Sequence, residues 1–410
     1  MRTLLSGGPF RWMWAGQTAS LLGDGAQGVA LAWLTLALTG SPLALGSVLL
    51  AGALPRAAVV LVGGAVSDRL SPRALLFASN VARAVVAAVL AGLATTGSVR
   101  VWELYAGSFA FGLGDAFFVP AAGAIVPQLV PADRDLTAAN ALLGVSEQGT
   151  MLVGPALGGV VVAAVGPGGA FGLNALSFLL AGAGLLPAPV RRTAPTEAAE
   201  GVWAGIRAGL AYAWSRVDLR VLLLLISVES LTYNGVFGVG LPALARSLAG
   251  GPVALGLLYS SWGCGQLAGA VSAGLTGLPR RWGLLVIAMT AGAGLAFATL
   301  GLLPALGPDA AVLAALGFGV AYSSDVALPT WVQHSTSPQL LGRVNGMIEL
   351  PRSALAPVSL VAFGALAGTS LAAAFVACGA VQLLAAAAAA RSRTVSGLVS
   401  APEEGPSTLS

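Results

Sequence analysis

Six carboxylates lie inside long apolar stretches of the sequence, where an apolar environment opposes their charge. They are Asp24, Asp115, Glu147, Glu229, Asp325 and Glu349. An ionisable residue in such a stretch is costly to keep, so it is a candidate for a functional role. The chemistry available to these groups is proton exchange, or charge pairing with a cationic or zwitterionic ligand.

One cation, Arg56, also lies in the middle of an apolar stretch and requires a counter-ion. Asp24 is the nearest candidate partner by topology, and Asp115 is the second. A carboxylate in a dry site favours its protonated form, whereas a nearby arginine opposes that shift. We therefore predict that Asp24 or Asp115, modulated by Arg56, exchanges protons. The alternative is a static ion pair that only stabilises the fold.

Other kinds of site chemistry have little support in the residues. Cys264 and Cys378 fall in apolar segments and the only histidine is His334, so we expect no metal site and no cofactor. We find no phosphate-binding loop and no nucleophile–base pair, which argues against an enzyme. The net charge of +4 is small, so no nucleic-acid partner is expected.

The elements that carry these residues are predicted to cross a membrane. The chain of 410 residues is 57% hydrophobic and 9% charged, whereas soluble domains carry about a quarter charged residues. No alternation of period two appears, so the apolar runs are expected to be helices of an all-α integral membrane fold embedded in the lipid bilayer. Twelve spans are predicted, near residues 11–38, 43–66, 74–95, 101–125, 139–164, 168–188, 219–245, 254–276, 283–303, 309–330, 345–368 and 370–390.

The arginines predict the orientation of these spans. All 20 basic residues are arginine, and most lie in the segments that share a side with the N-terminus. Because cytoplasmic loops are enriched in basic residues, both termini are expected on the cytoplasmic side of the cytoplasmic (inner) membrane. Arg83, inside the third span, is expected to extend toward the lipid headgroups.

The chain divides into two halves of six spans each. We assign residues 1–188 to the first half and 219–390 to the second. A linker at 189–218 contains an amphipathic helix, and 391–410 form a disordered cytoplasmic tail. The Pro-Ala-Asp-Arg run before Asn140 is echoed before Asn345, which lies 205 residues later. Two such halves in parallel relation are typical of one large class of transporters.

Two short motifs stand out between and within the spans. The loop at 63–73 carries Gly64, Asp68, Arg69 and Arg73, and it is either a charged gate or an ordinary cytoplasmic hairpin. The fifth span carries Gly154, Pro155, Gly158 and Gly159. Proline removes a helix hydrogen bond and the glycines permit bending, so this motif is either functional or a packing kink.

These motifs resemble those of the major facilitator superfamily. Its loop pattern G-x-x-x-D-R-x-G-R-[KR] matches Gly64, Asp68, Arg69 and Arg73, although Ser71 replaces the second glycine and Pro72 replaces an arginine. The G-P-x-x-G-G motif resembles that of drug:proton antiporters, although Thr150 replaces the glycine four residues upstream. The segments around Pro131–Asn140 and Gly342–Asn345 are similar to the macrolide-efflux and enterobactin-exporter branch.

The resemblance implies roles for further residues. Spans one, four, seven and ten would line a central cavity, so Asp24, Asp115, Glu229 and Asp325 would share one watery chamber. Tyr233, Asn234 and Tyr322 share helices with Glu229 and Asp325, so they are candidates to line a substrate site; the alternative is packing in the core. On the cytoplasmic side, Asp68 would latch onto the eleventh span near Arg343. Glu349 and Arg352, three residues apart, would pair near that gate.

The function implied is secondary active export of a small, partly lipophilic molecule by alternating access, with protons as the coupling ion. Within the same branch an anionic siderophore is an alternative substrate, with Arg56 as its anchor. Uptake of a metabolite, or lysolipid flipping, is a second alternative, and a membrane protein without transport activity is a third. We expect a monomer.

Overall fold

Helices make up nearly all of the described structure, and most of them are long and apolar. The computed structural model describes residues 8–62, 71–130, 133–188, 217–277, 282–335 and 338–392. Within these ranges every regular element is a helix, which confirms the predicted all-helical class. The predicted amphipathic linker helix lies outside the described residues, as do Gly64, Asp68 and Arg69 of the loop motif.

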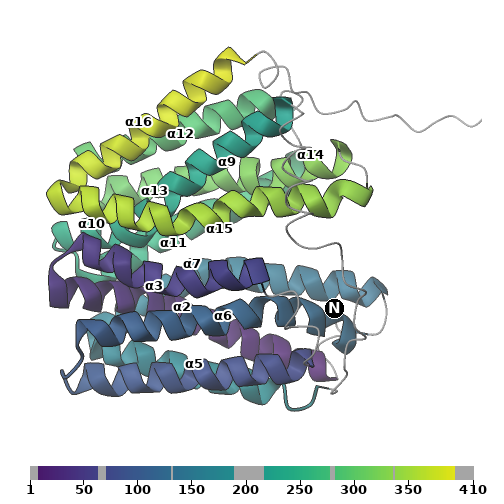
Figure 1. Cartoon of the computed structure of the whole chain (residues 1–410), viewed down its shortest axis with the longest axis vertical. Helices are drawn as coiled ribbons and strands as arrows, with labels where there is room; N and C mark the ends of the chain where they lie inside the picture. Colours follow the sequence, from purple (N-terminus) through teal and green to yellow (C-terminus); the bar gives the residue numbers. More distant parts are fainter. Residues whose placement is uncertain are drawn as a thin grey trace, which may run out of the picture.

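The helices form two groups, which Figure 1 shows stacked one above the other. The first group contains α2 (Pro9–Thr39), α3 (Pro42–Val62), α5 (Pro72–Thr95), α6 (Val101–Leu129) and α7 (Asp133–Gly184). The second contains α9 (Val217–Gly235), η1 (Val236–Gly240), α10 (Leu241–Ser247), α11 (Gly251–Thr276), α12 (Trp282–Leu302), α13 (Leu306–Val320), η2 (Ala321–Ala327), α14 (Leu328–Ser335), α15 (Pro338–Thr369) and α16 (Leu371–Arg391).

Local sequence signals explain where several helices begin and end. Ser71 accepts a hydrogen bond from the Ala74 amide, and Pro72 occupies the first turn of α5. Serine is a preferred N-cap and proline is favoured at the first helical position, so the two departures from the family loop motif start this helix. Gly40 ends α2 with a φ of 64°, a left-handed conformation that glycine adopts without strain.

The 52-residue helix α7 is interrupted at Gly166, which has a φ of 76° and a ψ of 173°. Glycine tolerates this conformation, and Pro167 then starts a second leg. The break falls between the fifth and sixth predicted spans. Nine helices in the described residues are long and apolar enough to cross a membrane, and α7 is one of them. The number of twelve spans therefore remains a prediction.

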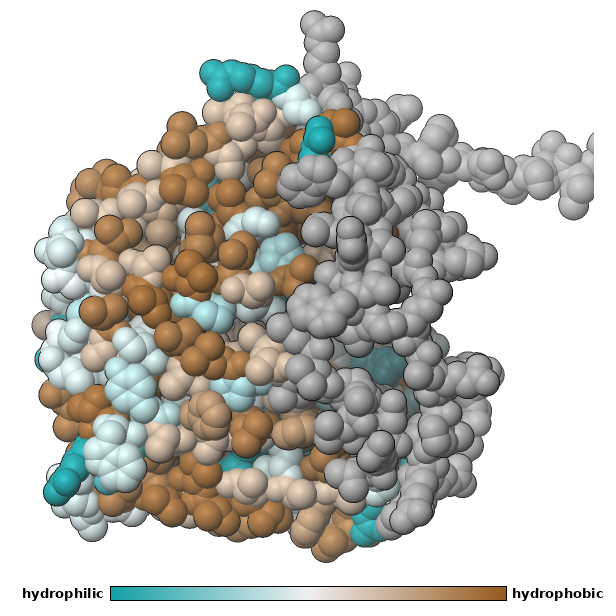
Figure 2. Space-filling view, viewed as in Figure 1, coloured by the Kyte–Doolittle hydropathy of each residue, from teal (hydrophilic) through white to brown (hydrophobic). Residues whose placement is uncertain are grey.

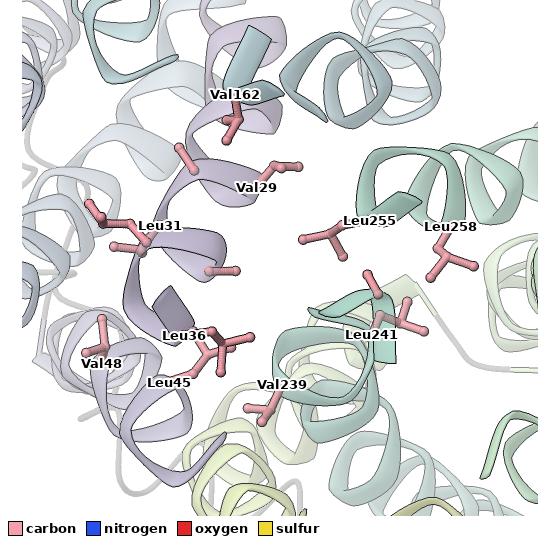
Figure 3. Packing of buried hydrophobic residues seen from close by; sticks show 14 of the residues in the cluster. Val29, Leu31, Leu36, Leu45, Val48, Val162, Val239, Leu241, Leu255 and Leu258 are labelled. Atoms are coloured by element: carbon pink, nitrogen blue, oxygen red, sulfur yellow. The ribbon is translucent and has the colours of Figure 1, made fainter. Parts of the chain in front are cut away.

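The two groups meet at one end of the bundle, which we call the closed end. It contains the turns at residues 40–41, 97–100 and 249–250, and it lies opposite the end at which α2 begins and α16 finishes (Figure 1). There α7 packs along α11 and α3 packs along α15. Figure 3 shows the shared apolar core, in which Leu36 and Leu45 face Val239, Leu241 and Leu255.

Many large hydrophobic side chains lie on the outer surface. Large hydrophobic side chains such as Leu384, at 71% exposure, and Leu275, at 82%, project outward. Figure 2 shows hydrophobic residues spread over much of the coloured face. Apolar surface of this extent is unfavourable in water, so the helices are those of a multi-pass membrane protein.

Candidate functional site

A cavity of about 400 Å³ lies within the first helix group. The described residues that line it come from α2, α3, α5, α6 and α7. Five ionisable side chains lie on its wall: Asp24, Arg56, Arg83, Asp115 and Glu147. The sequence predicted three of them, Asp24, Arg56 and Asp115, for the central site. Their neighbours in the structure differ from the predicted ones.

Arg83 and Asp115 form the ion pair of this cavity. Arg83 Nη1 donates to Asp115 Oδ1 at 2.9 Å, and Nη2 donates to Asn80 Oδ1 at 2.9 Å. The guanidinium carbon lies 4.3 Å from the ring centre of Phe118 and 4.4 Å from that of Phe178. Such positions over aromatic faces stabilise a cation. The expectation that Arg83 extends to the headgroups is wrong, because its side chain is 3% exposed.

The predicted pairing of Arg56 with Asp24 or Asp115 is also wrong. Among the described residues, Asp115 pairs with Arg83, and Arg56 is an exposed residue of the cavity wall. The position of Arg83 depends on a small neighbour. A Cβ atom added to Gly114 would lie 2.8 Å from Arg83 Cγ. The glycine in α6 therefore leaves room for the Arg83 side chain to pass over it. The local sequence around Arg83 and Gly114 gave no sign that these two residues would be in contact.

Asp24 is held by an amide that sequence reasoning missed. Asn174 Nδ2 donates to Asp24 Oδ1 at 3.1 Å and to Gln27 Oε1 at 2.7 Å. The Ser177 hydroxyl lies 2.8 Å from Asn174 Oδ1 and donates to it. Asn174 is 0% exposed, so its amide depends on these partners. The sequence signal that could have identified Asn174 is its polar amide within the mostly apolar sixth span.

The second helix group has a separate, smaller cavity of about 40 Å³, which Glu229 and Tyr233 line. The four predicted acids therefore do not share one chamber: Asp24 and Asp115 line the larger cavity and Glu229 lines this one. The side chain of Asp325 lies outside the described residues. Asp24 and Glu229 are separated because α2 and α9 stand in different helix groups, each of which has its own cavity.

The predicted substrate-site polar residues are dispersed. Tyr233 packs among aromatic rings, with centroids 5.7 Å from Phe237 and 5.0 Å from Phe297. Asn234 donates to the Ser230 carbonyl at 2.8 Å within its own helix. The Tyr322 hydroxyl donates to the Gly277 carbonyl at 3.0 Å, at the end of α11. Asn234 and Tyr322 line neither cavity.

The Gly-Pro motif of α7 lies where three helices touch. A Cβ atom on Gly158 would lie 2.5 Å from the Cα of Ala26 in α2. A Cβ atom on Gly159 would lie 2.6 Å from the Pro252 carbonyl oxygen in α11. Gly154 also packs against α2, opposite Gly25. The motif therefore permits backbone contact both inside the first group and across the closed end.

Comparison with known proteins places the chain in a family. A family model described as transmembrane secretion effector matches residues 3–402. The chain belongs to this family. The family is a branch of the major facilitator superfamily, so the resemblance inferred from the loop and Gly-Pro motifs is confirmed.

Curated relatives of the family are efflux proteins. The multidrug efflux pump Tap of Mycolicibacterium fortuitum is 31% identical over 84% of this chain and 86% of its own length. Macrolide efflux protein A of Streptococcus pyogenes is 25% identical over 86% of this chain and 87% of its own length. The enterobactin exporter EntS of Salmonella choleraesuis is 27% identical over 70% of this chain and 68% of its own length.

Solved structures show the same fold. A bacterial homologue of the iron transporter ferroportin, in an inward-facing state, aligns with a TM-score of 0.74 and 16% identity, covering 95% of this chain and 99% of that chain. The nucleoside transporter NupG aligns with a TM-score of 0.69 and 12% identity, covering 95% of this chain and 98% of that chain. The chain therefore shares its fold with these transporters, which agrees with its place in the major facilitator superfamily.

The predicted gate of the family is only partly described. Arg73 Nη2 donates to the Leu186 carbonyl at 2.8 Å, which ties the start of α5 to the end of α7. On α15, Glu349 and Arg352 lie 4.0 Å apart, and their side chains are 62% and 36% exposed. Arg343 lies in the same helix, but its side chain is outside the described residues. The gating role of these residues remains a prediction.

Proposed function

We propose that this protein exports a small, partly lipophilic molecule across the cytoplasmic membrane by alternating access, in exchange for protons. The observation that supports this most directly is the cavity of about 400 Å³ that contains both an ion pair and a separate carboxylate. A cavity of this size is in the range that holds drug-sized ligands. The efflux activities named for the curated relatives support the direction of transport.

Asp24 is the proposed proton carrier. The charge of Asp115 is balanced by Arg83 at 2.9 Å, whereas Asp24 accepts a hydrogen bond from the neutral amide of Asn174. In the described part of the chain no guanidinium lies within 4.0 Å of Asp24. A carboxylate without a bound cation changes its protonation at lower cost than one in an ion pair. Asp24 can therefore load and release a proton while the ion pair persists.

In the proposed cycle, the contacts at the closed end hold the two helix groups together on the side away from the cytoplasm. The apolar core and the α7–α11 contact join the two groups at the closed end. Ser260 of α11 adds a hydrogen bond of 2.5 Å to the Leu152 carbonyl of α7, and Arg246 of α10 donates to the Leu36 carbonyl of α2. Alternating access would require these contacts to separate while the opposite end closes.

The charges of the cavity wall favour a cationic or zwitterionic substrate. With Arg83 and Asp115 paired, Asp24, Glu147 and Arg56 remain to face a ligand. Two carboxylates and one guanidinium leave a negative balance when all are ionised. The exposed Arg56 also supports an anionic siderophore as a second candidate, because a guanidinium binds carboxylate and phenolate oxygens well.

The test uses inverted membrane vesicles with an imposed pH gradient and a fluorescent lipophilic cation. We expect the wild-type protein to accumulate the cation, and a protonophore to abolish that accumulation. Asp24→Asn should reduce pH-driven accumulation at least ten-fold. The matched control is Glu103→Gln, an acid-to-amide change in the first turn of α6, where glutamine can also accept the Arg100 amide. Unchanged pH-driven accumulation in Asp24→Asn would refute the assignment of Asp24 as the proton carrier.

A further inference from the structure

The carboxylate of Glu147 differs from the other carboxylates predicted to lie within spans. Four of the other five interact with a partner in the chain: Asp24, Asp115, Glu229 and Glu349. The side chain of the fifth, Asp325, lies outside the described residues. Glu147 is exposed, and its carboxylate forms no hydrogen bond or ion pair with any residue that the structure describes. A charge within a span is costly, so the partner of Glu147 is water or a ligand that enters the cavity.

The position of Glu147 on α7 directs it into the larger cavity. Four residues on one side of this helix line that cavity: Asn140, Leu143, Ser146 and Glu147. Trp14 Nε1 of α2 donates to the Ser146 hydroxyl oxygen at 2.8 Å, and that hydroxyl donates to the Leu142 carbonyl at 2.9 Å. These two hydrogen bonds fix this turn of α7 against α2, so the next residue, Glu147, is held at the cavity wall.

The part of the cavity wall that α6 supplies is mostly apolar. After Asp115, the lining residues of this helix are Phe118, Val119, Ala122, Gly123, Ile125 and Val126. Their spacing places them on one side of α6. The cavity of about 400 Å³ therefore offers an apolar surface to the body of a ligand and the Glu147 carboxylate to a charged group.

Two guanidinium groups also line this cavity, and neither neutralises Glu147. Arg83 is held by Asp115 at 2.9 Å and by the rings of Phe118 and Phe178. Arg56 is exposed on the wall, and within the described part of the chain no ion pair joins it to Glu147. A positive charge that pairs with Glu147 must therefore come from a ligand.

We propose that Glu147 is the residue that selects cationic substrates, by binding the positive charge of a lipophilic cation whose apolar body lies along α6. The assignment rests on the proposed export function and extends it, because it separates substrate binding at Glu147 from proton binding at Asp24. An ion pair in a cavity that is partly shielded from water is stronger than the same pair in bulk water, since the effective dielectric constant is lower. Removing the carboxylate should therefore abolish the preference for charged over neutral ligands.

The test measures equilibrium binding of two fluorescent alkyl probes to the purified full-length protein in detergent micelles. One probe has a trimethylammonium head group, and the other has an uncharged tert-butyl head group of the same shape. The wild-type protein should bind the cationic probe at least ten-fold more tightly, which corresponds to about 1.4 kcal/mol. Glu147→Gln should abolish this preference while its affinity for the neutral probe stays within two-fold of wild type.

Two control variants separate charge from shape. Glu147→Asp keeps the carboxylate and should still prefer the cationic probe. Glu103→Gln, the same kind of change in the first turn of α6, should retain the wild-type preference. Equal binding of both probes by the wild-type protein would overturn the proposal. An equal loss of affinity for both probes in Glu147→Gln would also overturn it, because the residue would then act only through the shape of the cavity.

A measurement on the wild-type protein covers the case in which Glu147→Gln does not fold. A probe with a primary ammonium head group is added together with a carbodiimide, which joins an amine to a carboxylate in contact with it, and the modified residue is identified by mass spectrometry. Coupling to Glu147 is expected, whereas coupling to Asp24 alone would refute the assignment. Cation-selective binding without accumulation in the vesicle assay would refute the export proposal alone. Accumulation of the cation by a Glu147→Gln variant with wild-type KM would refute this assignment alone.

Discussion

Removing Asp115 should destabilise the protein more than removing Arg83, although the two residues form one ion pair. The pair is asymmetric, because the Arg83 side chain is 3% exposed and that of Asp115 is 35% exposed. Asp115→Leu leaves a buried guanidinium without its carboxylate, and stranding a buried charge costs about 3–5 kcal/mol. Arg83→Met leaves a carboxylate that cavity water reaches, at a cost of about 1–3 kcal/mol. The expected difference is about 2 kcal/mol.

The double variant Arg83→Met, Asp115→Leu provides the control. The double variant removes both charges, so neither is left without its partner. Methionine keeps an apolar side chain between Phe118 and Phe178. We expect its stability to lie above that of Asp115→Leu, so that the two changes are not additive. The assay is reversible unfolding in mixed micelles, followed by tryptophan fluorescence. An Asp115→Leu variant as stable as Arg83→Met, or additive effects in the double variant, would refute the reasoning.

Two further predictions concern the contacts between helices. Asn174→Leu removes the donor to Asp24 and Gln27, so it should lower the free energy of unfolding by about 1–3 kcal/mol in the same assay. Gly23→Ala should also lower it, because the added Cβ would overlap with Asn174 Oδ1. A Gly23→Ala variant as stable as the wild type would contradict this geometry. Gly159→Val places a side chain against the Pro252 carbonyl. It should therefore separate the closed end and raise the labelling of cysteines introduced there, whereas unchanged labelling relative to wild type would count against the close contact.

The sequence alone determined the class of fold and the family. Hydrophobic transfer energy adds up over a local segment, so the length of each apolar run indicates a spanning helix without knowledge of its neighbours. The loop motif and the Gly-Pro motif are likewise local, and the family match confirms what they indicated. The presence of Asp24 and Asp115 in a site-sized cavity also follows from residue type, because a buried acid in an apolar helix needs a polar environment.

Only the tertiary structure decided which charges meet. The sequence placed both Arg56 and Arg83 inside spans, and counting residues favoured Arg56 as the central cation. The rotation of α5 and the close approach permitted by Gly114 instead bring Arg83 to Asp115. The same holds for Asn174, whose partners lie about 150 residues away on α2. Such contacts depend on how helices rotate and pack against one another, and a pairing between distant segments leaves no periodic signal in either one.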